Sequence, residues 1–286
     1  MNTGKPRRRI HIWSSWPVLA GLLLLPAHAQ AAQAQTYHVR FAASVGNMPF
    51  RCGQPYAEIG RGGATVTPEY FRFFVSGVRL IDADGHRVPL ELAQDGVWQR
   101  RDVAFLSFED PKSKCADGSP IEREEIVGDA PAGNYTGIEF ELGIPGDLNH
   151  GDATVAQSPL NLTDMFWTWQ SGYKFLRFDA RVAEPDGSNA GYFLHLGSTG
   201  CTQPGSGPVT CRNPHLETIA LSGFDPTKNV VVADLGSLFQ HADLAAAART
   251  GGCMSGPTQD CQPVMHDLGI AFGDDRGGPQ ALFRVR

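Results

Sequence analysis

The stretch YFRFFVSGVRLI (residues 70–81) is rich in aromatic and β-branched residues and runs into the turn DADG (residues 82–85). Residues of these kinds favour a β-strand that ends at such a turn. Similar segments recur along the chain, separated by turn signals such as DG, PG and NP: TYHVRFAASV (residues 36–45), VWQRRDVAFLSF, YTGIEFELGI, YKFLRFDARV, YFLHLGS and LETIALSGF. This succession of short strands and turns predicts an all-β fold, an antiparallel β-sandwich.

Few segments of the sequence have the periodicity of an α-helix. The segment DLGSLFQHADLAAAAR (residues 234–249) is amphipathic and predicts a helix capped by Asp234. Loops rich in Pro and Gly cover residues 202–209 and 251–263, and no internal repeat or linker interrupts the chain. We therefore expect residues 36–286 to form one β domain with long, disulfide-stapled loops and one or two short helices.

The N-terminus has the pattern of an export signal. MNTGKPRRRIHIW carries four cationic side chains and no acid, and the apolar stretch WPVLAGLLLLPAHA follows it. This is typical of a signal peptide over residues 1–29, with cleavage after Ala29 or as late as Ala34. The apolar run is shorter than the ~20 residues of a membrane span. We expect a periplasmic or outer-surface protein with no transmembrane segment in the mature chain.

The net charge of the chain disfavours some classes of binding partner. Removal of residues 1–29 takes away four cations and changes the formal charge from −6 to −10. An acidic surface argues against binding to nucleic acid or to anionic membranes. About 255 residues remain, enough for one large β domain or two smaller ones.

All six cysteines lie in the mature part of the chain. An even number in an exported chain predicts disulfides, and the absence of a CxxC pair disfavours a thiolate metal site. Six cysteines allow fifteen connectivities. Short intervening loops suggest two pairs and leave a third, so that the expected pairs are Cys201–Cys211, Cys253–Cys261 and Cys52–Cys115.

Residues capable of chemistry gather between positions 145 and 201. His150 lies in a polar loop, MFWTWQ holds Trp167 and Trp169, and His195 lies in an apolar segment. In a strand the two tryptophans share one face. That face is either part of the core or a stacking surface for a carbohydrate or peptide. No G-x-S-x-G motif marks a serine nucleophile, and nothing marks a carboxylate pair for glycoside hydrolysis.

Several motifs occur together and in one order: FAASVGNMPFRCG, YFRFFVSGVRL, VAFLSFED, LGIPGDLNH, MFWTWQSGYKFLRF and HLGSTGC. In this the chain resembles the MbnP-like proteins, also called metallo-mystery-pair four-Cys-motif proteins, over nearly all of its mature part. The resemblance implies an exported copper-binding protein that is not an enzyme. It also implies a partner, a di-haem peroxidase-like enzyme of the MbnH/MauG type.

The resemblance further implies that the partner converts a tryptophan to kynurenine, which binds Cu(I) together with two histidines. An indole N–H only donates hydrogen bonds and has no lone pair for a metal, whereas the opened ring carries an aryl amine and a ketone. Through the LNH motif the resemblance implies that His150 is a ligand, and through HLGSTGC that His195 is the second. We expect Trp167 or Trp169 to be the oxidised residue, and His38, on the first expected strand, to be a reserve ligand.

Overall fold

The computed structural model describes residues 1–4, 33–112, 114–115, 122–168, 170–203, 207–257 and 259–286. The chain divides into two units, residues 1–31 and 32–286, and all described strands and helices belong to the second. Most of the expected signal peptide lies outside the described residues. So does Trp169.

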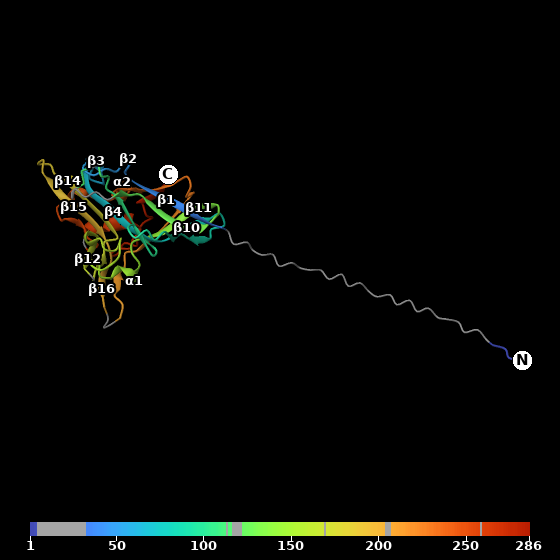
Figure 1. Cartoon of the computed structure of the whole chain (residues 1–286). Helices are drawn as coiled ribbons and strands as arrows, with labels where there is room; N and C mark the ends of the chain where they lie inside the picture. Colours follow the sequence, from blue (N-terminus) through green and yellow to red (C-terminus); the bar gives the residue numbers. More distant parts are fainter. Residues whose placement is uncertain (5–32, 113, 116–121, 169, 204–206, 258) are drawn as a thin grey trace. The chain divides into compact units, whose positions relative to one another are not determined.

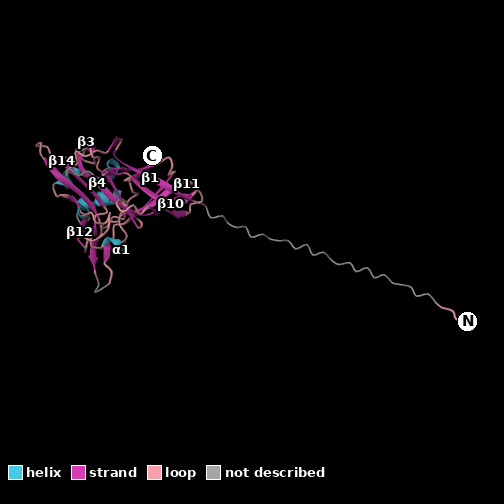
Figure 2. Cartoon of the chain, viewed as in Figure 1, coloured by secondary structure: helices cyan, strands magenta, loops and turns pink. Residues whose placement is uncertain are grey.

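Two large sheets build most of the described part of the second unit, and strands dominate it (Figures 1 and 2). The described strands of the smaller sheet are β21 (Phe283–Val285), β19 (Val230–Asp234), β1 (Ala34–Val45), β10 (Glu125–Pro131), β6 (Glu91–Leu92) and β2 (Met48–Pro49). The larger sheet runs β18 (Glu217–Ser222), β11 (Tyr135–Leu142), β4 (Ala64–Asp82), β14 (Leu176–Ala183), β15 (Asn189–Leu196) and β20 (Gly252–Cys253). It is extended by β3 (Tyr56–Ile59), β5 (Arg87–Pro89), β7 (Gln99–Arg100), β8 (Val103–Phe108) and β9 (Glu122–Arg123).

The remaining described elements are short. They are the strand pairs β12 (Phe166–Thr168) with β13 (Gly172–Tyr173) and β16 (Thr199–Thr202) with β17 (Thr210–Asn213), the α-helices α1 (Gly146–Asn149), α2 (Leu235–Leu238), α3 (Leu244–Ala248) and α4 (Gln262–Asp267), and the 3-10 helices η1 (Thr163–Met165) and η2 (Gln259–Cys261). The all-β prediction is confirmed. Most pairings are antiparallel, as expected, although β1 pairs with β19 and β15 with β20 in parallel.

Aromatic side chains from the two sheets interlock between them. Phe41 of β1 packs edge-on against Phe73 of β4, with ring centroids 6.3 Å apart, and against Phe140 of β11 at 5.8 Å. Phe283 of β21 meets Phe73 at 5.5 Å and Phe140 at 5.2 Å. This cross-sheet contact is the core of a sandwich, and it places the central strand β4 at the middle of the domain.

The central strand is buried on both faces. Residues 71–76 of β4 are all buried. Phe71 and Phe73 face the other sheet, whereas Arg72 and Phe74 point outward, where Phe74 meets the ring of Tyr173 of β13. The segment between β11 and β14, which contains α1, η1, β12 and β13, therefore covers the outer face of this sheet.

The prediction of a single helix over residues 234–249 is wrong, because the structure divides this segment into α2 and α3. Asp234 does cap α2, where its side chain accepts a hydrogen bond from the amide of Gly236. Asp243 caps α3 in the same way, and the carbonyl of Ala242 accepts a hydrogen bond from the amide of Arg61 at 2.8 Å. A continuous helix would use the Ala242 carbonyl for the amide of Ala246, but that amide bonds to the side chain of Asp243, so a new helix begins there.

The cysteines form the three expected pairs, which are Cys52–Cys115, Cys201–Cys211 and Cys253–Cys261. The second pair staples the β16–β17 hairpin, and the third joins β20 to η2. The prediction of disulfide-stapled loops is confirmed.

We expect Phe73→Ala to lower the free energy of unfolding by about 3–5 kcal/mol, because it removes a ring that contacts both sheets and leaves a cavity. Urea denaturation followed by circular dichroism measures the loss. Val97→Ala, at an exposed position, is the control and should change stability by less than about 0.5 kcal/mol. Equal effects of the two substitutions would contradict this account of the core.

Candidate metal centre

Several segments meet at one end of the larger sheet. Strand β14 begins and strand β15 ends there. Figure 1 shows α1, β12 and β16 close together at one end of the domain. Asn149 of α1 ties these segments together. Its side-chain oxygen accepts a hydrogen bond from the amide of Tyr173 at 2.8 Å, and its side-chain nitrogen donates to Ser198 Oγ at 3.2 Å.

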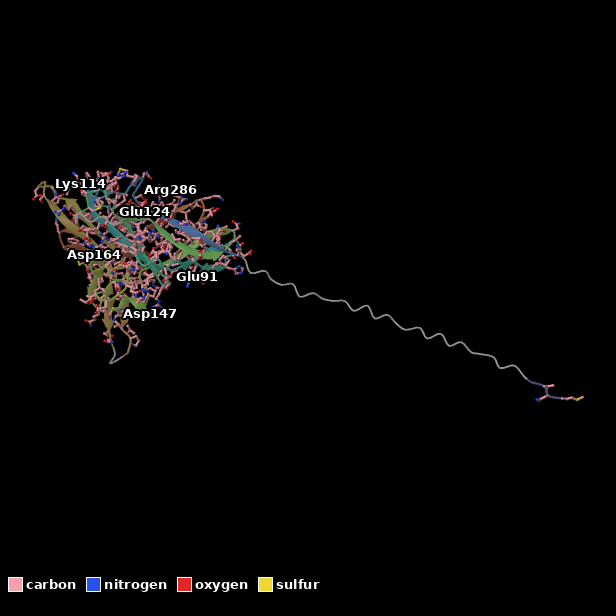
Figure 3. The ribbon with its side chains drawn as sticks, in the orientation of Figure 1. Glu91, Lys114, Glu124, Asp147, Asp164 and Arg286 are labelled. Carbon is pink, nitrogen blue, oxygen red and sulfur yellow. A yellow bond between two sulfur atoms is a disulfide. The ribbon has the colours of Figure 1, made fainter. Side chains whose placement is uncertain are left out.

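A buried arginine anchors the covering segment. Arg72 of β4 is 1% exposed and forms a two-pronged ion pair with Glu109, which is fully buried. Its third nitrogen bonds to Asp164 of η1, which is labelled in Figure 3. A charge removed from water requires such partners. The buried guanidinium therefore holds η1, and with it the following strand β12, against the sheet.

The same network continues across the sheet to a histidine. Arg177 of β14 donates to Asp164 at 3.1 Å and to Asp179 Oδ2 at 2.6 and 2.9 Å. Asp179 Oδ1 lies 2.7 Å from Nε2 of His195 on the neighbouring strand β15. Positive and negative groups thus alternate along the contacts from Glu109 to Asp179, and the series ends at His195.

The environment keeps His195 neutral. Burial lowers its pKa, and the hydrogen bond and charge of Asp179 only partly oppose this. Burial would raise the pKa of Asp179, but bonds from His195 and Arg177 together hold that pKa below its usual value. An ionised carboxylate only accepts hydrogen bonds, so the imidazole proton is on Nε2. The lone pair of His195 Nδ1 is left buried and without a hydrogen-bond partner.

Trp167 of β12 lies against Gly197, which follows His195 by two residues and comes directly after β15. A Cβ placed on Gly197 would lie 2.6 Å from Cζ3 of Trp167 and 2.7 Å from the carbonyl oxygen of Tyr173. Only glycine permits this approach, so the indole rests on the backbone at Gly197, just beyond the end of β15. Trp167 is partly buried and lines a cavity of about 340 Å³ together with Ser198, Gly200, Cys201, Met254 and Gln170.

His150 lies beside a disulfide. It follows α1, and its Nε2 is 3.4 Å from Cys211 Sγ and 3.4 Å from the side-chain nitrogen of Asn149. One ring nitrogen of His150 and the sulfurs of Cys201 and Cys211 lie within 4.8 Å of one another. Both sulfurs are oxidised, so they offer no thiolate, and these three residues do not form a Cys₂His metal site.

Sequence reasoning overlooked a third histidine near this point. His215 is buried, and its Nδ1 donates to the carbonyl of Gly197 at 2.8 Å. Burial lowers its pKa. Its φ of 50° is in the left-handed region, which is uncommon for a residue other than glycine. The ring lines a cavity of about 630 Å³. Nothing in CRNPH signals this placement, because it depends on the turn after β17.

The other expected residues have different surroundings. His38 lies on β1 of the smaller sheet, exposed, with its Nδ1 3.2 Å from Glu125. Its role as a reserve ligand stays a prediction. Trp169 lies outside the described residues, so its place relative to Trp167 also stays a prediction. The structure therefore brings His195 and Trp167 to the end of β15, and Asn149 links the segment of His150 to them.

A family model described as MbnP matches residues 34–255. The chain belongs to the MbnP family. The structure also resembles that of MbnP from Methylosinus trichosporium, with a TM-score of 0.75 and 32% identity over 88% of this chain and 98% of the other. No curated protein matches the sequence.

Membership of the MbnP family makes this chain a relative of copper-associated proteins. MbnP-like proteins are accessory proteins without enzymatic activity, in agreement with the expectation from the sequence. None of the described helices is long and apolar enough to cross a membrane. The three disulfides are consistent with an exported protein.

We expect Arg72→Met to lower the free energy of unfolding by about 3–5 kcal/mol, because it removes the buried ion pair between Arg72 and Glu109. Arg181→Met is the matched control. Arg181 forms an ion pair with Glu69 but is largely exposed, so its loss should cost less than about 1 kcal/mol. Guanidinium denaturation compares the two variants. Similar losses would show that the buried network contributes no more than a surface pair.

Proposed function

We propose that this chain is an exported protein that holds Cu(I) through His150, His195 and a kynurenine made from Trp167 or Trp169. A di-haem peroxidase-like enzyme of the MbnH/MauG type would carry out the oxidation. The chain would then be the substrate of its partner and a copper carrier, located in the periplasm or on the outer surface.

One observation carries the proposal. His195 Nδ1 is buried, neutral and unpartnered, while Nε2 is bonded to Asp179. Histidines that bind metals usually donate their other ring N–H to a carboxylate or a carbonyl, which fixes the tautomer and the ring plane. An orphaned buried nitrogen is costly in an ordinary core, and a metal ion would satisfy it. Imidazole nitrogen suits copper.

The neighbouring residues fit the same chemistry. Trp167 lies against Gly197, two residues after His195, and lines a cavity. It cannot ligate a metal as an indole, but ring opening would give it an amine and a ketone. Asn149 links the segment of His150 to Ser198, the residue after Gly197. The histidines and an aryl amine are neutral ligands, so the copper ion together with these ligands would carry only the charge of the ion.

Export is supported by two independent features. The first 29 residues have the pattern of a signal peptide, and all six cysteines of the mature part are paired in disulfides. Disulfides persist in the oxidising environment outside the cytoplasm. In the periplasm or on the outer surface, a separate haem enzyme could reach Trp167, because this side chain is only partly buried.

Co-expression with the di-haem partner should change the intact mass by the difference between tryptophan and kynurenine and add near-ultraviolet absorbance. Trp167→Phe and Trp169→Phe identify the modified residue, since only one of the two variants should lose the mass change. Trp98→Phe is the control, because this tryptophan stacks on Phe105 and does not line the cavity beside Trp167. An unmodified wild-type protein would overturn this part of the proposal.

Replacing either proposed histidine should weaken Cu(I) binding. We expect His150→Ala and His195→Ala in the modified protein each to raise the dissociation constant at least ~10-fold, about 1.4 kcal/mol. A competition titration with a Cu(I) chelator measures the change. His86→Ala is the control, because His86 lies in an exposed turn beside Asp82, and His38→Ala tests the reserve ligand.

Two results would contradict the ligand assignment. Normal copper binding by both variants would show that these histidines are not ligands, and loss of the folded state would show that their role is structural. A glycan-dependent change in tryptophan fluorescence without any need for metal would instead favour a carbohydrate-binding module.

A further inference from the structure

Two histidines that the function proposed above does not use lie in contact in the C-terminal part of the chain. His241 comes shortly after α2 and His266 is in α4; their ring centroids are 6.0 Å apart and their planes meet at 87°. Neither residue lines the cavity beside Trp167. The side chain of His241 is 60% exposed and that of His266 is 39% exposed. An ion in the solvent can therefore reach both rings.

A carboxylate holds each of these rings at Nδ1. Asp267 Oδ1 lies 2.7 Å from Nδ1 of His241, and both oxygens of Asp275 lie 3.1 Å from Nδ1 of His266. The bond with His266 lowers the pKa of Asp275, so this carboxylate is ionised and only accepts hydrogen bonds. In a neutral ring held in this way, the proton is on Nδ1 and the lone pair is on Nε2. None of the described residues hydrogen-bonds to Nε2 of either histidine.

The backbone around α4 fixes the two rings relative to each other. His266 and Asp267 are neighbours in α4, so the helix that carries one ring also anchors the other. The side chain of Asp267 is 3% exposed, and its carbonyl accepts a hydrogen bond from the amide of Ala281 at 2.7 Å. A Cβ added to Gly278 would lie 2.5 Å from Nε2 of His266 and 2.9 and 3.0 Å from the adjacent ring carbons. These similar distances place Gly278 over the face of the ring, so it does not block the in-plane lone pair of Nε2.

We propose that His241 and His266 form a second metal site, which binds Cu²⁺ through the two Nε2 atoms. Imidazole nitrogen suits copper, and Cu²⁺ binds most tightly of the first-row divalent ions. Metal–imidazole bonds of ~2.0–2.1 Å place the centres of two rings on one ion about 5–6 Å apart, in agreement with the observed contact. A carboxylate behind a ligating histidine fixes the tautomer and makes the ligand more basic. Asp267 and Asp275 together also balance the charge of a divalent ion.

The chain offers a matched control in the turn after β4. His86 is 75% exposed, and its Nδ1 lies 3.0 Å from Asp82. Its nitrogen and the carboxylates of Asp82 and Asp84 lie within 4.8 Å of one another, but this group contains no second imidazole. His86→Ala therefore removes an accessible histidine that is paired with a carboxylate from a different surface.

Titration of the mature, unmodified chain with Cu²⁺ tests the site. The protein is expressed without the di-haem partner, so both tryptophans of the MFWTWQ segment stay intact. We expect His241→Ala and His266→Ala each to weaken Cu²⁺ binding at least ~10-fold, and His86→Ala to change it by less than about twofold. Circular dichroism checks that each variant is folded. Loss of Cu²⁺ binding in His86→Ala alone would assign the ion to the turn and overturn the proposal.

Pulsed electron paramagnetic resonance counts the imidazole ligands without any substitution. We expect two imidazoles on Cu²⁺ in the wild-type protein and in His86→Ala, and at most one in His241→Ala or His266→Ala. Fewer than two imidazoles in the wild type, or unchanged affinity in both variants, would overturn the assignment. Because this site needs no kynurenine, an absence of tryptophan oxidation would overturn only the function proposed above.

Discussion

The burial of Arg72 in the middle of the central strand constrains the rest of this structure. A guanidinium removed from water needs carboxylates around it. Glu109, directly after β8, supplies one carboxylate, and Asp164 of η1 supplies another. The second contact matters most for the site, because Asp164 is only three residues from Trp167. A charge requirement in the sheet thereby determines where the aromatic segment lies.

The same network prepares His195. Asp164 is shared between Arg72 and Arg177, and Arg177 in turn holds Asp179, which fixes the tautomer of the histidine. A preorganised ligand depends on supporting groups of this kind, because ordering a freely rotating ring would cost free energy and so weaken metal binding. The unpartnered Nδ1 is thus a product of the whole network, and a local sequence motif around the histidine does not account for it.

Covalent and steric constraints act at the same end of the domain. Two of the three disulfides lie there, one beside His150 and one directly before Met254. Gly197 lets the indole of Trp167 approach the backbone directly after β15. His215 holds the carbonyl of that same glycine and adopts a left-handed backbone conformation to do so. Residues in such conformations concentrate at functional sites, and this one borders the second cavity of the region.

By itself, the sequence determined the strands, the sandwich class and the three cysteine pairs. These follow from local periodicity, turn residues and short spacings, which a linear reading contains. It missed the division of the helix into α2 and α3, although the N-cap Asp243 is local; the bond from the amide of Arg61 to the Ala242 carbonyl, between segments distant in the chain, could not be read from it. Only the tertiary structure decided the partners of Arg72, which are 37 and 92 residues away, and the placement of Met254 beside Trp167. Such contacts join segments distant in the chain, and they are selected by burial and charge pairing in the folded state.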